Sequence, residues 1–164
     1  MPEHYRSPIY LQHTSGTRYM SKLGSFGLFN EGQVTLPDGY QDRTVNIFTS
    51  FAKDAPSFTV SRDSLEPNEA LAAYIDRQLA QMQQHLKQWQ QSERCPATLG
   101  ENLSHGEIVH GSYQRNGRQV WQQQAVFNLQ GAHILVFTMT ATVMLTEADN
   151  VLFDSLLKRF RLHA

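Results

Sequence analysis

The alternation of apolar and polar residues predicts a chain built largely from short strands. Residues 57–62 place Phe58 and Val60 on one side and serine or threonine on the other, which is the two-residue period of a strand. The stretch at 44–51 is unusual, because apolar residues fall on both of its sides. Further strands are expected at 33–36, 106–114, 118–128 and 133–144. Strands that follow one another this closely favour an antiparallel sheet.

Turn residues separate these segments. The Asn-Gly pair at 116–117 is among the strongest short-range signals of a hairpin, and the Gln-Gly pair at 130–131 marks the next turn. A Pro-Asp-Gly turn occupies 37–39, and the short link at 53–56 predicts a hairpin between the strands on either side of it. The last three strands are therefore expected to form a meander.

One long helix is expected between the two groups of strands. Pro67 and Asn68 stop the sheet and start the helix, with Asn68 as its cap. An apolar stripe at helical spacing then runs for about six turns and is expected to cover a sheet face. The stripe consists of Leu71, Ile75, Leu79, Met82, Leu86 and Trp89. A linker around Cys95 and Pro96 is expected to follow.

A second helix is expected to close the chain. Thr146 is its predicted cap. Its predicted buried stripe is Val151, Leu152, Leu156 and Phe160. Together these elements predict an α+β fold, in which an antiparallel twisted sheet packs against the long helix and the C-terminal helix, and the other sheet face forms a groove. Residues 26–164 are expected to form one domain, and the polar residues 1–25 a flexible N-terminal arm.

Charge and hydropathy narrow the classes of partner. The formal net charge is −1, so the 164-residue chain has no basic footprint for nucleic acid and no polybasic patch for an anionic membrane. The longest apolar run falls far short of the roughly 20 residues of a membrane helix. The N-terminal residues lack the apolar core of a secretory signal, so a cytoplasmic protein without membrane insertion is expected.

Candidate catalytic residues do not form a recognisable set. His105 and His110 lie five residues apart, which places them on opposite sides of a strand, and no third metal ligand is evident. No nucleophile elbow or phosphate-binding loop is present. Cys95 is expected to be a passive thiol. We expect no enzyme, no metal and no cofactor, although a hydrolase that uses His105 or His110 remains a third hypothesis.

The two sheet faces differ in chemistry. The long helix is expected to cover the bulky residues Phe48, Phe58, Val60, Trp121 and Phe127. The complementary positions mix β-branched apolar groups with neutral hydrogen-bonding groups. They are Val45, Ile47, Ser57, Thr59, Ser61, Val120, Gln122, Gln124, Val126, Ile134, Val136, Thr138 and Thr140. Such a face is either a half-hydrated sheet surface or a groove for an apolar guest, such as a hydrophobic helix.

Four segments carry a family resemblance. They are EGQVTLPDGYQDRTVNIF at 31–48, SFTVSRD at 57–63, YIDRQL at 74–79 and YQRNGRQVWQQQAVF at 113–127. In this order they resemble the Eag family of effector-associated chaperones of bacterial type VI secretion, which is related to DcrB and to the PsbP-like fold. The resemblance implies a non-catalytic, homodimeric adaptor. Its partner would be the N-terminal transmembrane helices of a PAAR or Rhs effector, held in the cytoplasm for loading onto the secretion spike.

The resemblance also implies site residues. Gln78 and Gln124 match the family's polar contacts, and Leu86 matches an apolar helix position. Tyr40 stands where the family often has Trp. The predicted effector-binding groove consists of Val45, Ile47, Ser57, Thr59, Ser61, Gln78, Leu86, Val120, Gln122, Gln124, Val136 and Thr138. The alternative is a non-enzymatic PsbP-like or DcrB-like accessory protein that binds a soluble partner, in the periplasm if a signal peptide precedes it.

Overall fold

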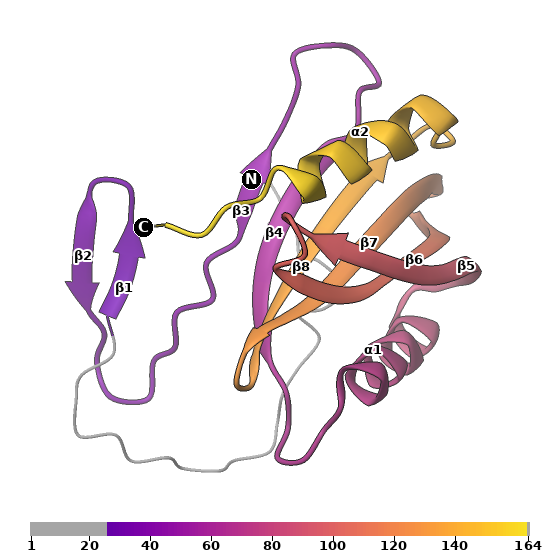
Figure 1. Ribbon diagram of the computed structural model, residues 1–164. Coiled ribbons are helices and arrows are strands. Elements are labelled where there is room, and N and C mark those ends of the chain that lie inside the picture. The colour runs from indigo at the N-terminus through magenta and orange to yellow at the C-terminus, as the bar shows by residue number, and fades with distance from the viewer. Residues whose placement is uncertain (1–25, 164) are drawn as a thin grey trace.

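The computed structural model describes residues 26–163, so the predicted arm at 1–25 lies outside the described residues. The described part contains two helices and two antiparallel sheets (Figure 1). The elements are β1 Phe26–Phe29, β2 Gly32–Thr35, β3 Asn46–Phe48, β4 Ser57–Ser64, α1 Leu71–His85, β5 Lys87–Leu99, β6 Ser104–Arg115, β7 Arg118–Gln130, β8 His133–Ala141 and α2 Glu147–Lys158. The predicted α+β fold class is confirmed.

The main sheet has six strands in the order β3-β4-β8-β7-β6-β5. The predicted meander forms β6, β7 and β8, with the hairpin turn at Asn116 and Gly117, both of which adopt positive φ. The predicted pairing of the strands around the 53–56 link is also confirmed, as β3 and β4. β1 and β2 form a separate hairpin beside the main sheet (Figure 1).

The predicted long helix is shorter than expected. α1 ends at His85, and the chain then continues as β5, which contains Trp89, Cys95 and Pro96. The prediction of a helix through Trp89 and of a linker at Cys95 is therefore wrong. Trp89 packs over Gly111 of β6, where even a methyl group would lie 2.3 Å from the indole. Proline is tolerated in β5 because this strand lies at the edge of the sheet.

The two helices lie on opposite faces of the main sheet. Tyr74 and Ile75 of α1 pack against a cluster that includes Val126 of β7. Phe153 of α2 packs against the other side of β7, where Phe127 is buried. The expectation that the long helix covers the aromatic face, and leaves the other face free, is therefore wrong. Strand periodicity separates the two faces but does not say which helix covers which face.

The beginning of α1 differs from the prediction. The residue that caps α1 is Ala70, which offers no side-chain hydrogen bond, so the prediction that Asn68 is the cap is wrong. Asn68 instead adopts a positive φ of 63° in the preceding turn. The helix is tied to the sheet by Tyr74, whose hydroxyl donates to the Asp63 carboxylate over 2.7 Å. Burial and the neighbouring Asp63 raise the pKa of Tyr74, so it stays a hydrogen-bond donor at neutral pH.

The beginning of α2 agrees with the prediction. The Thr146 side chain accepts from the Asp149 backbone amide, and the Asp149 carboxylate accepts in return, which completes a capping box. The buried stripe of α2, in contrast, lies one position later in the sequence than predicted. Phe153 and Leu157 are buried, whereas Leu152 remains 48% exposed. The predicted burial of Val151 and Leu152 is therefore wrong, while Leu156 and Phe160 pack against the core in part.

Candidate functional site

The predicted groove residues on β4, β7 and β8 lie on the same sheet face as α1. Thr59 pairs with Thr138, which in turn pairs with Gln124, so the three form one row across the sheet. Ser61 and Gln122 lie in the rows on either side. Because side chains in register share a face, the three strands present these polar side chains on one face, with Val136 and Val126 in the row of Ser61.

Four of these side chains are buried without a hydrogen-bond partner. Within the described part of the chain, Ser61 Oγ, Gln122 Nε2, Gln124 Nε2 and Thr138 Oγ1 make no hydrogen bond, and none of the four residues is more than 4% exposed. We call these four residues the polar stripe. An unpaired buried polar group typically costs about 1–3 kcal/mol, so four on one face require an explanation.

The residues around the polar stripe become more exposed toward the β3 edge of the sheet. Ser57 and Thr59 on β4 are half-buried, and Ile47, which pairs with Thr59, is 53% exposed. Val45 lies just before β3 and is half-buried. The predicted groove therefore has an apolar, accessible rim at β3 and a polar floor that is covered in the structure.

The remaining predicted groove residues lie on or beneath α1. Gln78 belongs to the buried side of the helix and is 7% exposed. Leu86, at the end of α1, packs against a cluster that contains Val120. Val120 and Val136 are both fully buried in the core under α1. These two valines are therefore not accessible to a guest in the structure, and the four residues of the polar stripe are buried to the same extent.

The chemistry of this surface favours binding. The polar stripe and its rim contain only hydroxyl, amide and aliphatic groups, none of which titrates near neutral pH. Neutral groups of this kind bond to a polar partner without the desolvation cost of a charge. The surface can therefore hold an apolar guest that carries a few polar or backbone groups.

The histidines and the cysteine lie apart from this surface. His105 is exposed, and β6 places it on the opposite face from His110. The Thr98 hydroxyl lies 3.4 Å from His105 Nδ1. Among the described residues, no three metal-binding side chains come together. Burial, together with the nearby Glu93 carboxylate, raises the pKa of the Cys95 thiol.

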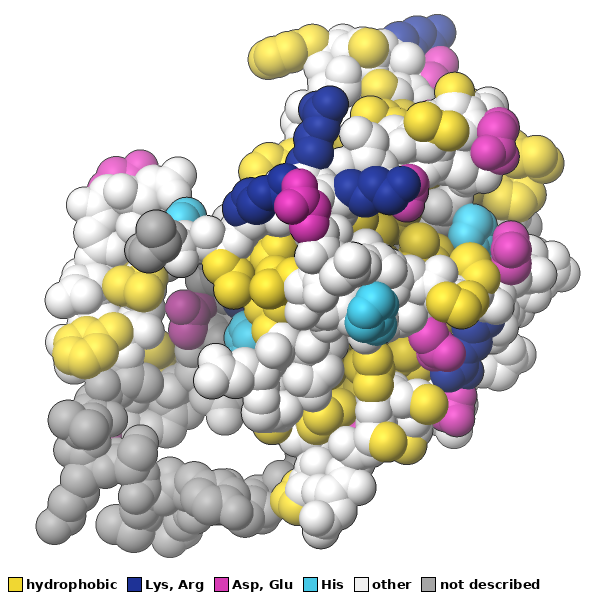
Figure 2. Space-filling view, in the orientation of Figure 1, with side chains coloured by type: hydrophobic (Ala, Val, Ile, Leu, Met, Phe, Trp, Pro, Cys, Tyr) yellow, Lys and Arg dark blue, Asp and Glu magenta, His cyan; other side chains and the backbone are white. Residues whose placement is uncertain are grey.

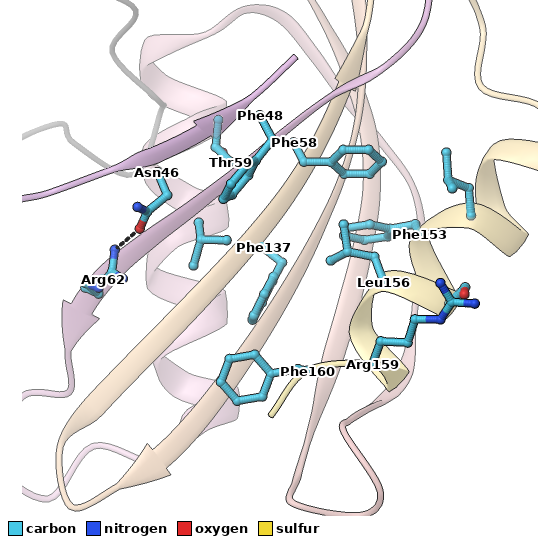
Figure 3. Close-up of a pocket in the computed structure, with 13 residues that line it drawn as sticks. Asn46, Phe48, Phe58, Thr59, Arg62, Phe137, Phe153, Leu156, Arg159 and Phe160 are labelled. Atoms are coloured by element: carbon cyan, nitrogen blue, oxygen red, sulfur yellow. Dashed lines mark hydrogen bonds between the residues drawn. The ribbon is translucent and has the colours of Figure 1, made fainter. Parts of the chain in front are cut away.

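The structure also contains a cavity that the sequence did not predict. A cavity of about 600 Å³ lies on the α2 face, between α2 and the edge formed by β3 and β4 (Figure 3). Figure 2 shows hydrophobic side chains gathered near the C-terminal end of α2, beside several Lys and Arg side chains. Thr59 is the one predicted groove residue that also borders this cavity. Three of its lining residues, Phe48, Phe58 and Val60, are among those that the sequence predicts to lie under the long helix.

No helix among the described residues has the length and apolar character needed to cross a bilayer. The separate β1–β2 hairpin carries apolar side chains that remain about half exposed or more. They are Phe26, Leu28, Phe29 and Val34.

Comparisons with known proteins agree with the motifs. The family model described as DcrB matches residues 31–159. The protein Effector EagT6 of Pseudomonas aeruginosa is 28% identical over 120 residues, which cover 69% of this chain and 78% of that protein. The resemblance to the Eag and DcrB-related family is thereby confirmed.

A solved structure shows the same fold. A Pseudomonas aeruginosa protein of unknown function, PA94, described as a putative regulator, superposes with a TM-score of 0.66 at 22% identity. The superposition covers 86% of this chain and 98% of PA94. The family match spans the whole six-stranded sheet, both helices and every residue of the polar stripe. The chain therefore belongs to the DcrB family.

Proposed function

We propose that this protein is a non-enzymatic type VI secretion chaperone. In this proposal it binds and shields the N-terminal transmembrane helices of a PAAR or Rhs effector in the cytoplasm, acts as a homodimer, and promotes loading of the effector onto the secretion spike. The observation that carries the proposal is the polar stripe, whose four buried side chains lack partners in the described chain. The similarity to a protein named Effector EagT6 supports an association with effectors.

The two parts of the surface have different roles in this proposal. Val45 and Ile47 at the rim bury apolar side chains of the guest helix, and each square ångström removed from water contributes roughly 25 cal/mol. The polar stripe bonds to polar side chains or exposed backbone groups of the guest. The guest helix enters from the β3 edge, where exposure is greatest, and the side chains over the floor shift to admit it. These hydrogen bonds to the guest then remove the free-energy cost of burying the polar groups without partners.

A double substitution tests the proposal. Val45→Gln with Ile47→Gln removes apolar area from the rim and adds polar groups that the guest cannot satisfy. We expect the folded double variant to lose co-purification with the N-terminal region of the effector, which is first identified by pull-down from the native bacterium. The matched control is Val151→Gln with Leu152→Gln, because these α2 residues are 62% and 48% exposed and contribute little to the core. Normal recovery of the effector by the rim variant would refute the proposal.

A further inference from the structure

The cavity on the α2 face has a chemistry different from that of the polar stripe. Its walls are largely apolar and include five phenylalanines, Phe48, Phe58, Phe137, Phe153 and Phe160 (Figure 3). Phe58 and Phe153 stack with their ring centroids 6.3 Å apart, and Phe137 meets Phe160 edge to face at 5.8 Å. These ring contacts hold the walls in place. The volume of about 600 Å³ falls in the range typical of small-molecule sites.

The charged residues that line the cavity are all cationic. Arg62 and Arg159 line it, and no aspartate or glutamate does. Arg62 Nη1 donates to Asn46 Oδ1 over 2.8 Å (Figure 3). It also donates to the Thr44 carbonyl over 3.2 Å, so both acceptors are uncharged. Among the described residues, no carboxylate lies within ion-pair distance of either arginine. Arg62 is thus a positioned cation without an ion-pair partner among the described residues. After the hydrogen bonds from Thr44, its charge contributes to lowering the pKa of Asp42, so the Asp42 carboxylate belongs to its surroundings.

We propose that this cavity binds an alkyl-chain carboxylate, such as a fatty acid. The acyl chain lies among the phenylalanine rings, and the carboxylate bonds to Arg62 at the β3–β4 end of the cavity. Charge complementarity selects an anionic head group, and the aromatic walls select an apolar body. A peptide is a poorer occupant, because few neutral polar groups line the cavity to bond to its backbone. This site lies across the sheet from the polar stripe and does not depend on the proposed chaperone function.

Ligands with the same chain and different head groups test the selectivity. Laurate, dodecanol and dodecylammonium are titrated into the delipidated full-length chain, and binding is followed by calorimetry below micelle-forming concentrations. We expect saturable binding of laurate, about tenfold weaker binding of dodecanol because the charged hydrogen bond is lost, and still weaker binding of dodecylammonium. Equal affinity for the three ligands, or no binding of laurate, would overturn the proposal.

Variants on the two sheet faces locate the site. Arg62→Gln should weaken laurate binding about tenfold, and Arg62→Lys should restore much of it because the charge returns. Because Arg62 also holds Asn46, a second variant is needed that leaves β3 unchanged. Ser155→Trp on α2 places an indole at the cavity wall and should abolish binding, with folding checked by circular dichroism.

The control for these variants is Ile47→Gln. Ile47 is exposed on the opposite face and does not line the cavity. We expect this variant to bind laurate as the wild type does. If Ile47→Gln weakened laurate binding while a folded Ser155→Trp variant bound normally, the ligand would lie on the α1 face and the proposal would be wrong.

Discussion

At the scale of single residues, the most informative side chains are those whose polar atoms have no partner. Gln124 is 3% exposed, and its amide nitrogen makes no hydrogen bond with the described chain. A purely structural role would favour an apolar residue of similar size at this position, because burying an unpaired amide costs free energy. The same amide is useful to a protein that must bond to an incoming guest.

We therefore predict that Gln124→Met raises the free energy of unfolding of the isolated protein by about 1–2 kcal/mol while weakening its complex with the effector. Urea denaturation measures the first effect, and co-purification measures the second. The control is Gln130→Met at the exposed end of β7, which should change stability by less than about 0.5 kcal/mol. A less stable Gln124→Met variant would contradict the assignment of Gln124 as an unsatisfied group.

The membership of the polar stripe could be predicted from the sequence in part. The two-residue period of the strands places Ser61, Gln124 and Thr138 on one side, as the structure has them. The same period places Val136 beside them, and Val136 is buried as they are, in the core under α1. Periodicity identifies the side on which a residue lies, whereas its cover depends on where a helix packs.

The thiol of Cys95 gives a prediction that depends on pH. Burial raises the pKa of Cys95 in the folded protein above its unfolded value, so the folded state holds the proton more tightly. Its contribution to stability is present below the unfolded pKa and is lost as the pH rises through the folded pKa. We expect alkylation by iodoacetamide at pH 8 to be slower in the folded chain than in urea. An equal or faster rate in the folded chain would show a reactive thiol instead.

At the scale of elements, the change from α1 to β5 decides how the α1 face is built. Leu86 and Trp89 continue the helical spacing of α1, which is why the sequence predicts a longer helix. The structure instead ends α1 at His85, and Gln88 adopts a positive φ of 54° as β5 begins. Trp89 then covers the backbone of Gly111. Contact between segments more than 20 residues apart overrides the local pattern here.

The fit of Trp89 on Gly111 can be tested by adding one methyl group. Gly111→Ala would place its Cβ 2.3 Å from the indole, so Trp89 must move. We predict a loss of about 1–3 kcal/mol in the free energy of unfolding, the usual cost of overpacking. Gly32→Ala on β2 is the matched control, because no atom lies within 4 Å of its added Cβ and its stability should change little. Equal stabilities of the two variants would show that Trp89 is not held over Gly111.

The hairpin turn between β6 and β7 and the start of α2 show what the sequence can predict for elements, whereas the predicted cap of α1 is wrong. The Asn-Gly turn at 116–117 and the Thr146 cap were both predicted, because each depends on residues close in sequence. The edge position of β5 was not predicted, since it depends on pairing with β6. Turn and cap residues therefore locate the boundary of an element well only where contacts with segments distant in sequence do not override them.

At the scale of the whole molecule, the sheet separates two surfaces of different chemistry. The α1 face carries the polar stripe and its apolar rim, and the α2 face carries the aromatic cavity with its arginines. The sequence predicts two unlike faces, but it does not predict that each receives its own helix. The stack of Phe58 on Phe153 of α2 shows why the aromatic face does not need the long helix.

Site-specific photo-crosslinking tests the central claim, that the effector's N-terminal helices bind at the β3 rim of the α1 face. A photoreactive phenylalanine analogue replaces Ile47 in one variant and Leu152 in another, since the two residues are 53% and 48% exposed but belong to opposite faces. After irradiation of the complex of this protein with the effector, mass spectrometry identifies the crosslinked peptides. We predict crosslinks from position 47 to the apolar N-terminal helices of the effector and none to these helices from position 152. Crosslinks from position 152 alone, in an intact complex, would contradict the claim.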